Sequence, residues 1–112
     1  MLKQSTGLDA MFQALADPSR RSMVERLSRG SASVSELAEP LDMSMPAVMQ
    51  HLAVLEASGI VRSTKVGRVR SCQLEQGALS AAEQWLSDHR LLWEQRLDRL
   101  GAMLAAEQEN ER

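Results

Sequence analysis

The side chains most able to bind a charged ligand lie in one short segment of this 112-residue sequence. Residues 61–72 contain four basic side chains and no acidic one (+4), whereas the remainder carries −6, which gives the total of −2. Basic side chains concentrated in this way create a positive potential that suits phosphate groups. The predicted phosphate ligands are Arg62, Lys65, Arg68 and Arg70.

A second set of candidate ligands lies on a helix predicted at 44–58, directly before this basic segment. Ser44 can cap the start of the helix, Pro46 falls in its first turn, and Gly59 is suited to end it. At 100° per residue, one narrow apolar stripe predicts the buried face of the helix. The stripe consists of Val48, Leu52 and Leu55.

The opposite face of this helix carries no charge and little bulk, so it could lie close to another surface. Gln50 points most directly outward, and its amide can form two hydrogen bonds with adenine in the major groove of DNA. An ordinary solvated helix face is the alternative interpretation. The predicted base-reading residues are Ser44, Met45, Ala47, Met49 and Gln50.

The segments before residue 44 are predicted to position this helix. Apolar residues at i, i+3, i+4 and i+7 predict a first helix over 8–16, and Asp17-Pro18 predicts the cap and first turn of a second helix that ends near Arg29. A capping box at 33–36 begins a short helix, which ends before Pro40. The short helix, a turn and the helix 44–58 together predict a helix-turn-helix.

The basic segment itself is predicted to be a β-hairpin. Residues 61–66 and 69–74 have strand character, and Gly67-Arg68 can form a two-residue turn with glycine in the first central position. All four clustered cations lie on this hairpin. We therefore interpret it as a wing that contacts the DNA backbone or the minor groove.

The last third of the chain is predicted to be a single helix over 78–107. Leu79, Leu86, Trp93 and Leu100 recur every seven residues, and Leu97 and Leu104 lie four residues beyond the last two. A helix of this length, roughly 40 Å at 1.5 Å per residue, is longer than so small a domain can cover. Its apolar stripe therefore suggests contact with a second copy of the chain.

This order of elements resembles the ArsR/SmtB-type winged helix-turn-helix repressors, from about Leu8 to Leu104. The segments that carry the resemblance are LADPSRRSMVERL, SVSELAEPLDMSMPAVMQHLAVLEASGIV and VGRVRSCQL. It implies a mainly α fold with a small β-hairpin, a homodimer formed by the first and last helices, and a palindromic DNA site. The predicted interface residues are Leu8, Met11, Phe12, Leu86, Trp93, Leu97, Leu100 and Leu104.

Two departures from the family pattern limit what the resemblance implies. Met49-Gln50 precedes His51-Leu52 where the family commonly has serine followed by lysine or arginine, so base preference is expected to differ. The family's metal ligands are also missing. Glu36, Ala38 and Glu39 occupy the short-helix position, and Asp88-His89-Arg90 has no second histidine in its helix. No metal site and no cofactor are therefore predicted.

Several residues also have less specific interpretations. A packed histidine with one hydrogen bond is expected at His51, and a half-buried small side chain is expected at Cys72, although a thiol-responsive regulator is an alternative. Trp85 and Trp93 are expected to pack in the dimer interface, and a pocket for an unknown small effector is the other interpretation. A winged-helix module that binds proteins is the rival function.

Taken together, these features predict a cytoplasmic, sequence-specific transcriptional regulator that is not an enzyme and does not enter a membrane. No phosphate-binding loop or nucleophile motif occurs, no apolar run reaches the 18 residues of a membrane span, and no secretory segment follows Met1. Cys72 is a lone cysteine, in keeping with a reducing compartment. We expect an N-terminal arm at 1–7, one domain at 8–106 and a frayed tail at 107–112.

Overall fold

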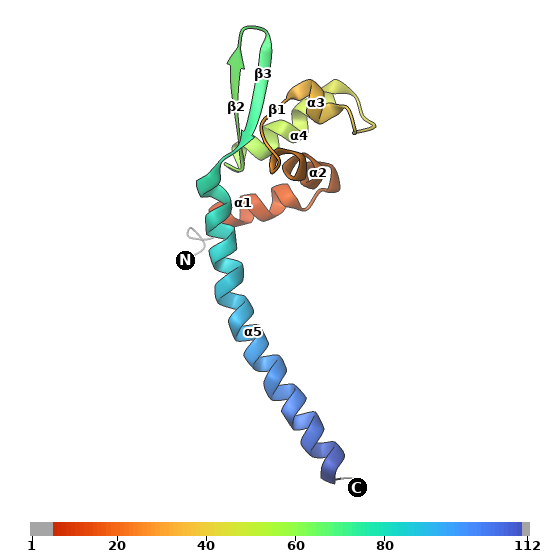
Figure 1. The fold of residues 1–112 in the computed structure, drawn as a ribbon, viewed down its shortest axis with the longest axis vertical. Coiled ribbons are helices and arrows are strands. Elements are labelled where there is room, and N and C mark those ends of the chain that lie inside the picture. The colour runs from red at the N-terminus through yellow and green to blue at the C-terminus, as the bar shows by residue number, and fades with distance from the viewer. Residues whose placement is uncertain (1–5, 111–112) are drawn as a thin grey trace. The chain divides into compact units, whose positions relative to one another are not determined.

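The computed structural model describes residues 6–110 and contains a three-stranded sheet and five helices within them (Figure 1). Residues up to Ser80 and residues from Ala81 onward form two compact units. In chain order the elements are α1 (Thr6–Leu15), α2 (Pro18–Leu27), β1 (Ala32–Ser33), α3 (Val34–Ala38), α4 (Met45–Ala57), β2 (Val61–Val66), β3 (Val69–Leu74) and α5 (Gln76–Asn110).

The core of the first unit forms where α1, α2 and α4 contact one another and where α2 and α4 contact the sheet. The predicted stripe of α4 is confirmed, because Val48, Leu52 and Leu55 are at most 1% exposed. Met23 and Leu27 from α2 are buried with them, as is Leu37 from α3, which packs against α4. The apolar periodicity of the sequence therefore predicted the buried face of α4 correctly.

Three helices of this unit begin at the predicted capping residues. Asp17 accepts a hydrogen bond from the backbone N–H of Arg20, and Ser44 accepts one from the N–H of Ala47. Ser33 and Glu36 form the complete capping box, in which the side chain of each residue accepts from the other's backbone N–H at 3.1 Å. These bonds satisfy amide groups that have no partner inside the helix.

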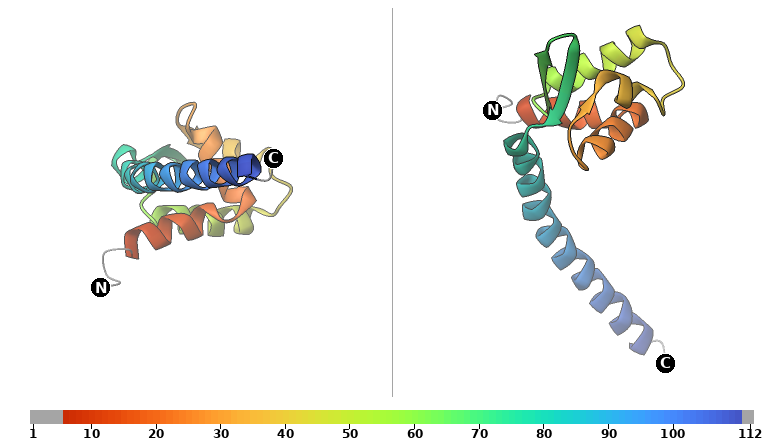
Figure 2. Two further views of the ribbon diagram at one scale, coloured as in Figure 1. Left: turned by 90° about the horizontal axis from the view of Figure 1, so that it is seen from below. Right: turned by 45° about the horizontal axis from the view of Figure 1, so that its top comes forward.

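The hairpin has the predicted two-residue turn, with Val66 opposite Val69. Gly67 adopts a φ of 64°, while no described residue other than glycine has a positive φ, so Arg68 does not. A positive φ at the first central residue alone is the type II′ arrangement, which matches the twist of the strands. The hairpin projects beside the helices of the first unit (Figures 1 and 2).

The sheet contains a strand that the sequence did not predict. β1 pairs with β3, with Ala32 opposite Cys72 and Ser33 opposite Ser71, so the strand order is β1-β3-β2. A strand of two residues is too short to show alternation. The expectation of a hairpin alone is therefore corrected to a three-stranded antiparallel sheet.

Several element boundaries also differ from the expectation. α1 begins at Thr6 rather than Leu8, α2 ends at Leu27, and α5 spans Gln76–Asn110 instead of 78–107. α1 thus includes part of the expected arm, and α5 includes part of the expected tail. Residues 1–5 and 111–112 lie outside the described residues. None of the helices described is both long and apolar enough to span a bilayer.

Candidate nucleic-acid interface

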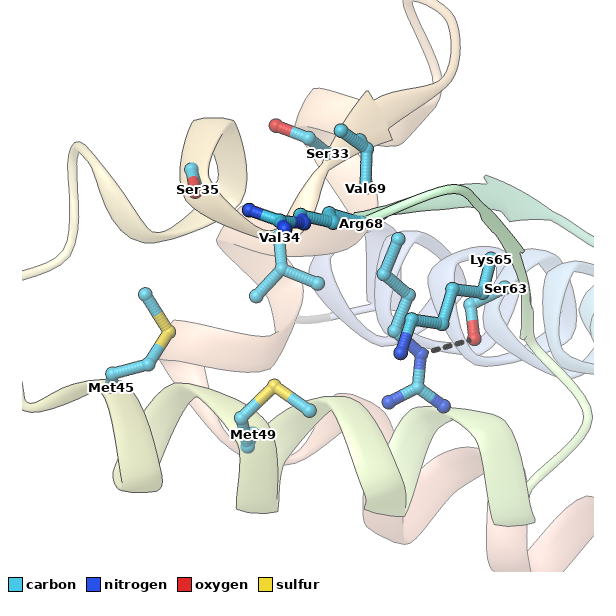
Figure 3. Close-up of a pocket in the computed structure, with 10 residues that line it drawn as sticks. Ser33, Val34, Ser35, Met45, Met49, Ser63, Lys65, Arg68 and Val69 are labelled. Carbon is cyan, nitrogen blue, oxygen red and sulfur yellow. Dashed lines mark hydrogen bonds between the residues drawn. The ribbon is translucent and has the colours of Figure 1, made fainter.

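A groove of about 780 Å³ lies between α4, the start of α3 and the β2–β3 hairpin (Figure 3). It brings the two predicted sets of ligands together, because residues of the helix 44–58 and of the basic hairpin share its walls. The lining residues are Ser33, Val34, Ser35, Met45, Met49, Ser63, Lys65, Arg68, Val69 and Arg70.

The α4 wall of this groove is formed by methionines. Met45 is 47% exposed and Met49 is half-buried, and both side chains extend from α4 into the groove (Figure 3). Gln50, the leading candidate for base reading, is exposed on α4 but does not line the groove. Its amide forms no hydrogen bond within residues 6–110 and is therefore available to an external partner.

The other two predicted base-reading residues differ in availability. The hydroxyl of Ser44 caps α4 by accepting from Ala47, which occupies one of its lone pairs. Ala47 is half-buried and offers only a methyl group. The outer surface of α4 is therefore largely apolar, with Gln50 as its amide-bearing residue.

Two of the four cations of the hairpin form ion pairs with acidic residues of the described chain, and the other two do not. Arg62 lies 3.7 Å from Glu75, and Arg70 lies 3.6 Å from Glu56. Arg70 also donates to the hydroxyl of Ser63 at 2.9 Å, the bond drawn in Figure 3. Residues 61–72 contain no acidic residue, but acidic residues outside that segment pair with these two arginines.

Lys65, near the end of β2, and Arg68, the second residue of the turn, remain available. Both are exposed, and neither forms an ion pair with an acid of the described part of the chain. Because they also line the groove, an anion lying across it would meet both charges. The positive potential of the hairpin is thus concentrated at its turn.

A half-buried polar cluster fixes α4 against α1 and α2. The guanidinium of Arg20 donates to the carbonyls of Ala14 at 2.7 Å and Gln13 at 3.1 Å, which lie at the end of α1, and contacts Nδ1 of His51 at 3.1 Å. Asp17 lies 3.8 Å from the same nitrogen. His51 is therefore the packed, hydrogen-bonded histidine expected from the sequence.

Comparisons with known proteins agree with this architecture. A helix-turn-helix domain model matches residues 15–64. The HTH-type transcriptional regulator Rv2034 of Mycobacterium tuberculosis is 47% identical over 73 residues, which cover 65% of this chain and 68% of that protein. The crystal structure of an ArsR family transcriptional regulator is 52% identical, with a TM-score of 0.73, and the match covers 79% of this chain and 91% of that one.

The chain belongs to the ArsR family. It is therefore a winged helix-turn-helix transcriptional regulator rather than an enzyme, as the sequence predicted. A more distant relative is the transcriptional repressor SdpR of Bacillus subtilis, which is 24% identical over 79 residues covering 70% of this chain and 88% of that protein.

The metal ligands associated with the ArsR/SmtB pattern have no equivalent in this member. Glu36 is engaged in the capping box, and Nδ1 of His89 contacts the carbonyl oxygen of Trp85 at 2.8 Å. Within residues 6–110, no three side chains of histidine, cysteine, aspartate or glutamate come together in a way that could hold a metal ion.

Cys72 lies on β3, the central strand of the sheet, and is fully buried, at 0% exposure. Burial raises the pKa of its thiol, and the nearby carboxylate of Glu56 raises it further. A thiol is reactive when it is exposed and deprotonated. The environment of Cys72 therefore disfavours the thiol-responsive alternative, and its burial exceeds the half-buried position expected.

The residues predicted to pair two ArsR-type chains have different surroundings. Met11 is 6% exposed, so its side chain lies in the core of its own chain. Leu8 is half-buried and Phe12 is 37% exposed. The five predicted positions on α5 are 51–65% exposed: Leu86, Trp93, Leu97, Leu100 and Leu104.

The aromatic residues of α5 border a shallow hollow of about 570 Å³. Its walls are Trp85, Leu86, His89, Arg90 and Trp93. The rings of Trp85 and His89 stack with centroids 4.1 Å apart. The hollow lies on the same stretch of α5 as the predicted interface, so both earlier interpretations, dimer packing and effector binding, concern one surface.

Proposed function

We propose that this protein is a homodimeric repressor that places α4 in the major groove of a palindromic operator. The observation that carries the proposal is the groove shared by α4 and the hairpin, which combines an outer helix face of low charge with the unpaired cations Lys65 and Arg68. A helix of this kind can approach base edges, while the hairpin binds the backbone or minor groove. The relative SdpR is named as a transcriptional repressor, which supports repression rather than activation.

Dimerisation is proposed from the exposed apolar residues of α5. Leu86, Trp93 and Leu100 follow one another at seven-residue intervals, and Leu97 and Leu104 complete the alternating four- and three-residue spacing of a coiled-coil seam. Large apolar side chains that are about half exposed or more on one helix face mark an interaction surface. A second copy of α5 offers the matching surface, and Leu8 and Phe12 of α1 are proposed to join it.

The salt dependence of DNA binding tests this proposal. Binding of the full chain to labelled duplexes from the region upstream of its own gene is measured by fluorescence anisotropy at several salt concentrations. Two unpaired cations in each of two chains give four phosphate contacts, so log K should fall with log salt with a slope of about −3.6 or steeper. Binding that is absent, or insensitive to salt, would favour the protein-binding module instead.

A further inference from the structure

Several hydroxyl groups in or near the groove already take part in hydrogen bonds inside the chain. The hydroxyl of Ser33 accepts from Glu36, and the hydroxyl of Ser44 at the start of α4 accepts from Ala47. Ser63 donates to Glu56 and accepts from Arg70. Of these hydroxyls, only that of Ser63 both donates and accepts within the chain, whereas Ser33 and Ser44 each keep an O–H that can still donate.

Besides Ser35 and the two cations, three apolar side chains face the space between the start of α3 and α4. Val34 at the start of α3 faces α4 across the groove, and Met45 and Met49 extend toward it from α4 (Figure 3). Met45 is 47% exposed, and the other two are half-buried. These three residues form an apolar wall, hereafter the Val34–Met45–Met49 wall, beside the cations at the turn of the hairpin.

Each base pair presents a different chemical pattern in the major groove, and only thymine presents a methyl group there. An apolar wall gains free energy by burying that methyl. It loses free energy if it covers the amino group of cytosine or adenine, or the acceptors of guanine, without replacing their hydrogen bonds to water. Flexible methionine side chains can adapt to the position of the methyl group.

From this chemistry, we propose that the Val34–Met45–Met49 wall reads thymine methyl groups in each half-site of the operator. The inference rests on the proposed DNA-binding function and specifies its sequence preference. Lys65 and Arg68 hold the neighbouring phosphates, so charge sets the affinity and the methyl contacts set the preference. Gln50, outside the groove, reads a separate position.

The experiment begins with a duplex selected by the wild-type protein from a random library. Each thymine of the selected duplex is then replaced by deoxyuridine, which removes the methyl group and retains base pairing. Loss of one buried methyl contact should weaken binding about fourfold, and the same replacement in both half-sites about sixteenfold. The replacement is made in the DNA, so the protein remains wild type and its folding is unaffected.

Protein variants assign the effect to the wall. In Met49→Ala or Met45→Ala, the ratio of affinities for the thymine and deoxyuridine duplexes should approach one at the position that the deleted side chain contacts. Val54→Ala is the matched control, because Val54 is 40% exposed on α4 and does not line the groove. This control should keep the wild-type ratio.

The outcomes separate the inference from the function on which it rests. If selection yields no duplex bound more tightly than random DNA, sequence-specific DNA binding itself is rejected. If a specific duplex is recovered but contains no thymine whose methyl matters, the thymine inference alone is overturned. A methyl effect that persists unchanged in Met45→Ala, Met49→Ala and Val34→Ala also overturns it, because residues outside the wall then read the methyl.

Discussion

The apolar stripes of α4 and α5 follow the same helical spacing but meet different surroundings. Val48 and Leu52 of α4 are at most 1% exposed, whereas Trp93 and Leu97 of α5 are 65% and 63% exposed. Other elements of the first unit cover the α4 stripe. Periodicity therefore identifies an apolar face, but it does not identify what covers that face.

The hairpin shows the same contrast for charged side chains, between those that have partners in the described part of the chain and those that do not. Arg62 and Arg70 have acidic partners in their own chain, whereas Lys65 and Arg68 have none among residues 6–110. Groups that are satisfied within the chain contribute to its stability. Groups without such partners can bind another molecule. We propose that this molecule is a second copy of the chain at α5 and DNA at the hairpin.

The largest effect is expected from Leu97→Asp, which places a negative charge in the exposed apolar stripe of α5. If two copies pack through α5, the substitution removes two buried leucines and should weaken the dimer by about 3–6 kcal/mol. Sedimentation at micromolar concentration should then give a monomer with greatly reduced DNA binding. The first unit should keep its helix content by circular dichroism, because Leu97 lies outside that unit.

Leu91→Asp is the matched control for this comparison. Leu91 is 61% exposed and precedes Trp93 by two residues, so it projects from nearly the opposite side of the helix. The control should remain a dimer. A dimeric Leu97→Asp, or a monomeric Leu91→Asp, would place the contact elsewhere.

Leu52→Ala, in the buried stripe of α4, should reduce the stability of the fold rather than weaken the dimer. Leu52 is 1% exposed, and its truncation leaves a cavity, so unfolding free energy should fall by about 2–5 kcal/mol. Urea denaturation measures the change. Val54→Ala on the same helix, at 40% exposure, should cost less than about 1 kcal/mol, and equal losses for the two variants would contradict the buried assignment.

A smaller effect should distinguish the open and paired cations of the hairpin. Arg68→Ala should reduce the steepness of the salt dependence of DNA binding by about one for each chain, because one phosphate contact is lost. Arg62→Ala should change the slope less, since Arg62 is already paired with Glu75. The reverse order would show that the ion pair opens when DNA binds.

The smallest effect concerns the pH dependence of stability, to which the hydrogen-bonded carboxylate of Asp17 contributes. The hydrogen bond from the N–H of Arg20 lowers the pKa of Asp17, and the charges of His51 and Arg20 lower it further. A lowered folded-state pKa stabilises the protein above the unfolded-state value, and the stabilisation is lost as pH falls through the folded-state value. The loss should therefore appear below about pH 4.

Asp17→Asn tests this assignment, because asparagine can still cap α2 but does not titrate. Between pH 6 and pH 3, the urea midpoint should fall less in the variant than in the wild type. Asp9→Asn, which changes an exposed carboxylate that forms no side-chain hydrogen bond in the described chain, is the control. Equal behaviour of Asp17→Asn and wild type would remove the proposed role of the cap in acid stability.

Local features of this protein could be predicted because the interacting residues are close in sequence. The cap at Asp17, the capping box of Ser33 and Glu36, and the turn at Gly67 depend on bonds or dihedral angles within a few residues. The buried stripe of α4 follows from helical geometry alone. These features also sufficed to predict the winged helix-turn-helix.

Long-range features needed the folded chain. The strand β1 exists because β3 supplies its hydrogen-bond partners, and Arg70 is neutralised by Glu56 from α4, 14 positions earlier in the sequence. Likewise, Met11 follows the same i, i+3, i+4 spacing as Phe12, and only packing determines that Met11 is buried while Phe12 is 37% exposed.

The sequence by itself thus determined the helices, the hairpin and the apolar face of each helix, because short-range sterics and helical periodicity specify them. Tertiary structure decided which cations remain unpaired and which side chains enter the groove. It placed Met45 and Met49 in the groove and left Gln50 outside it. The physical reason is that charge pairing and groove shape depend on segments that approach one another only after folding.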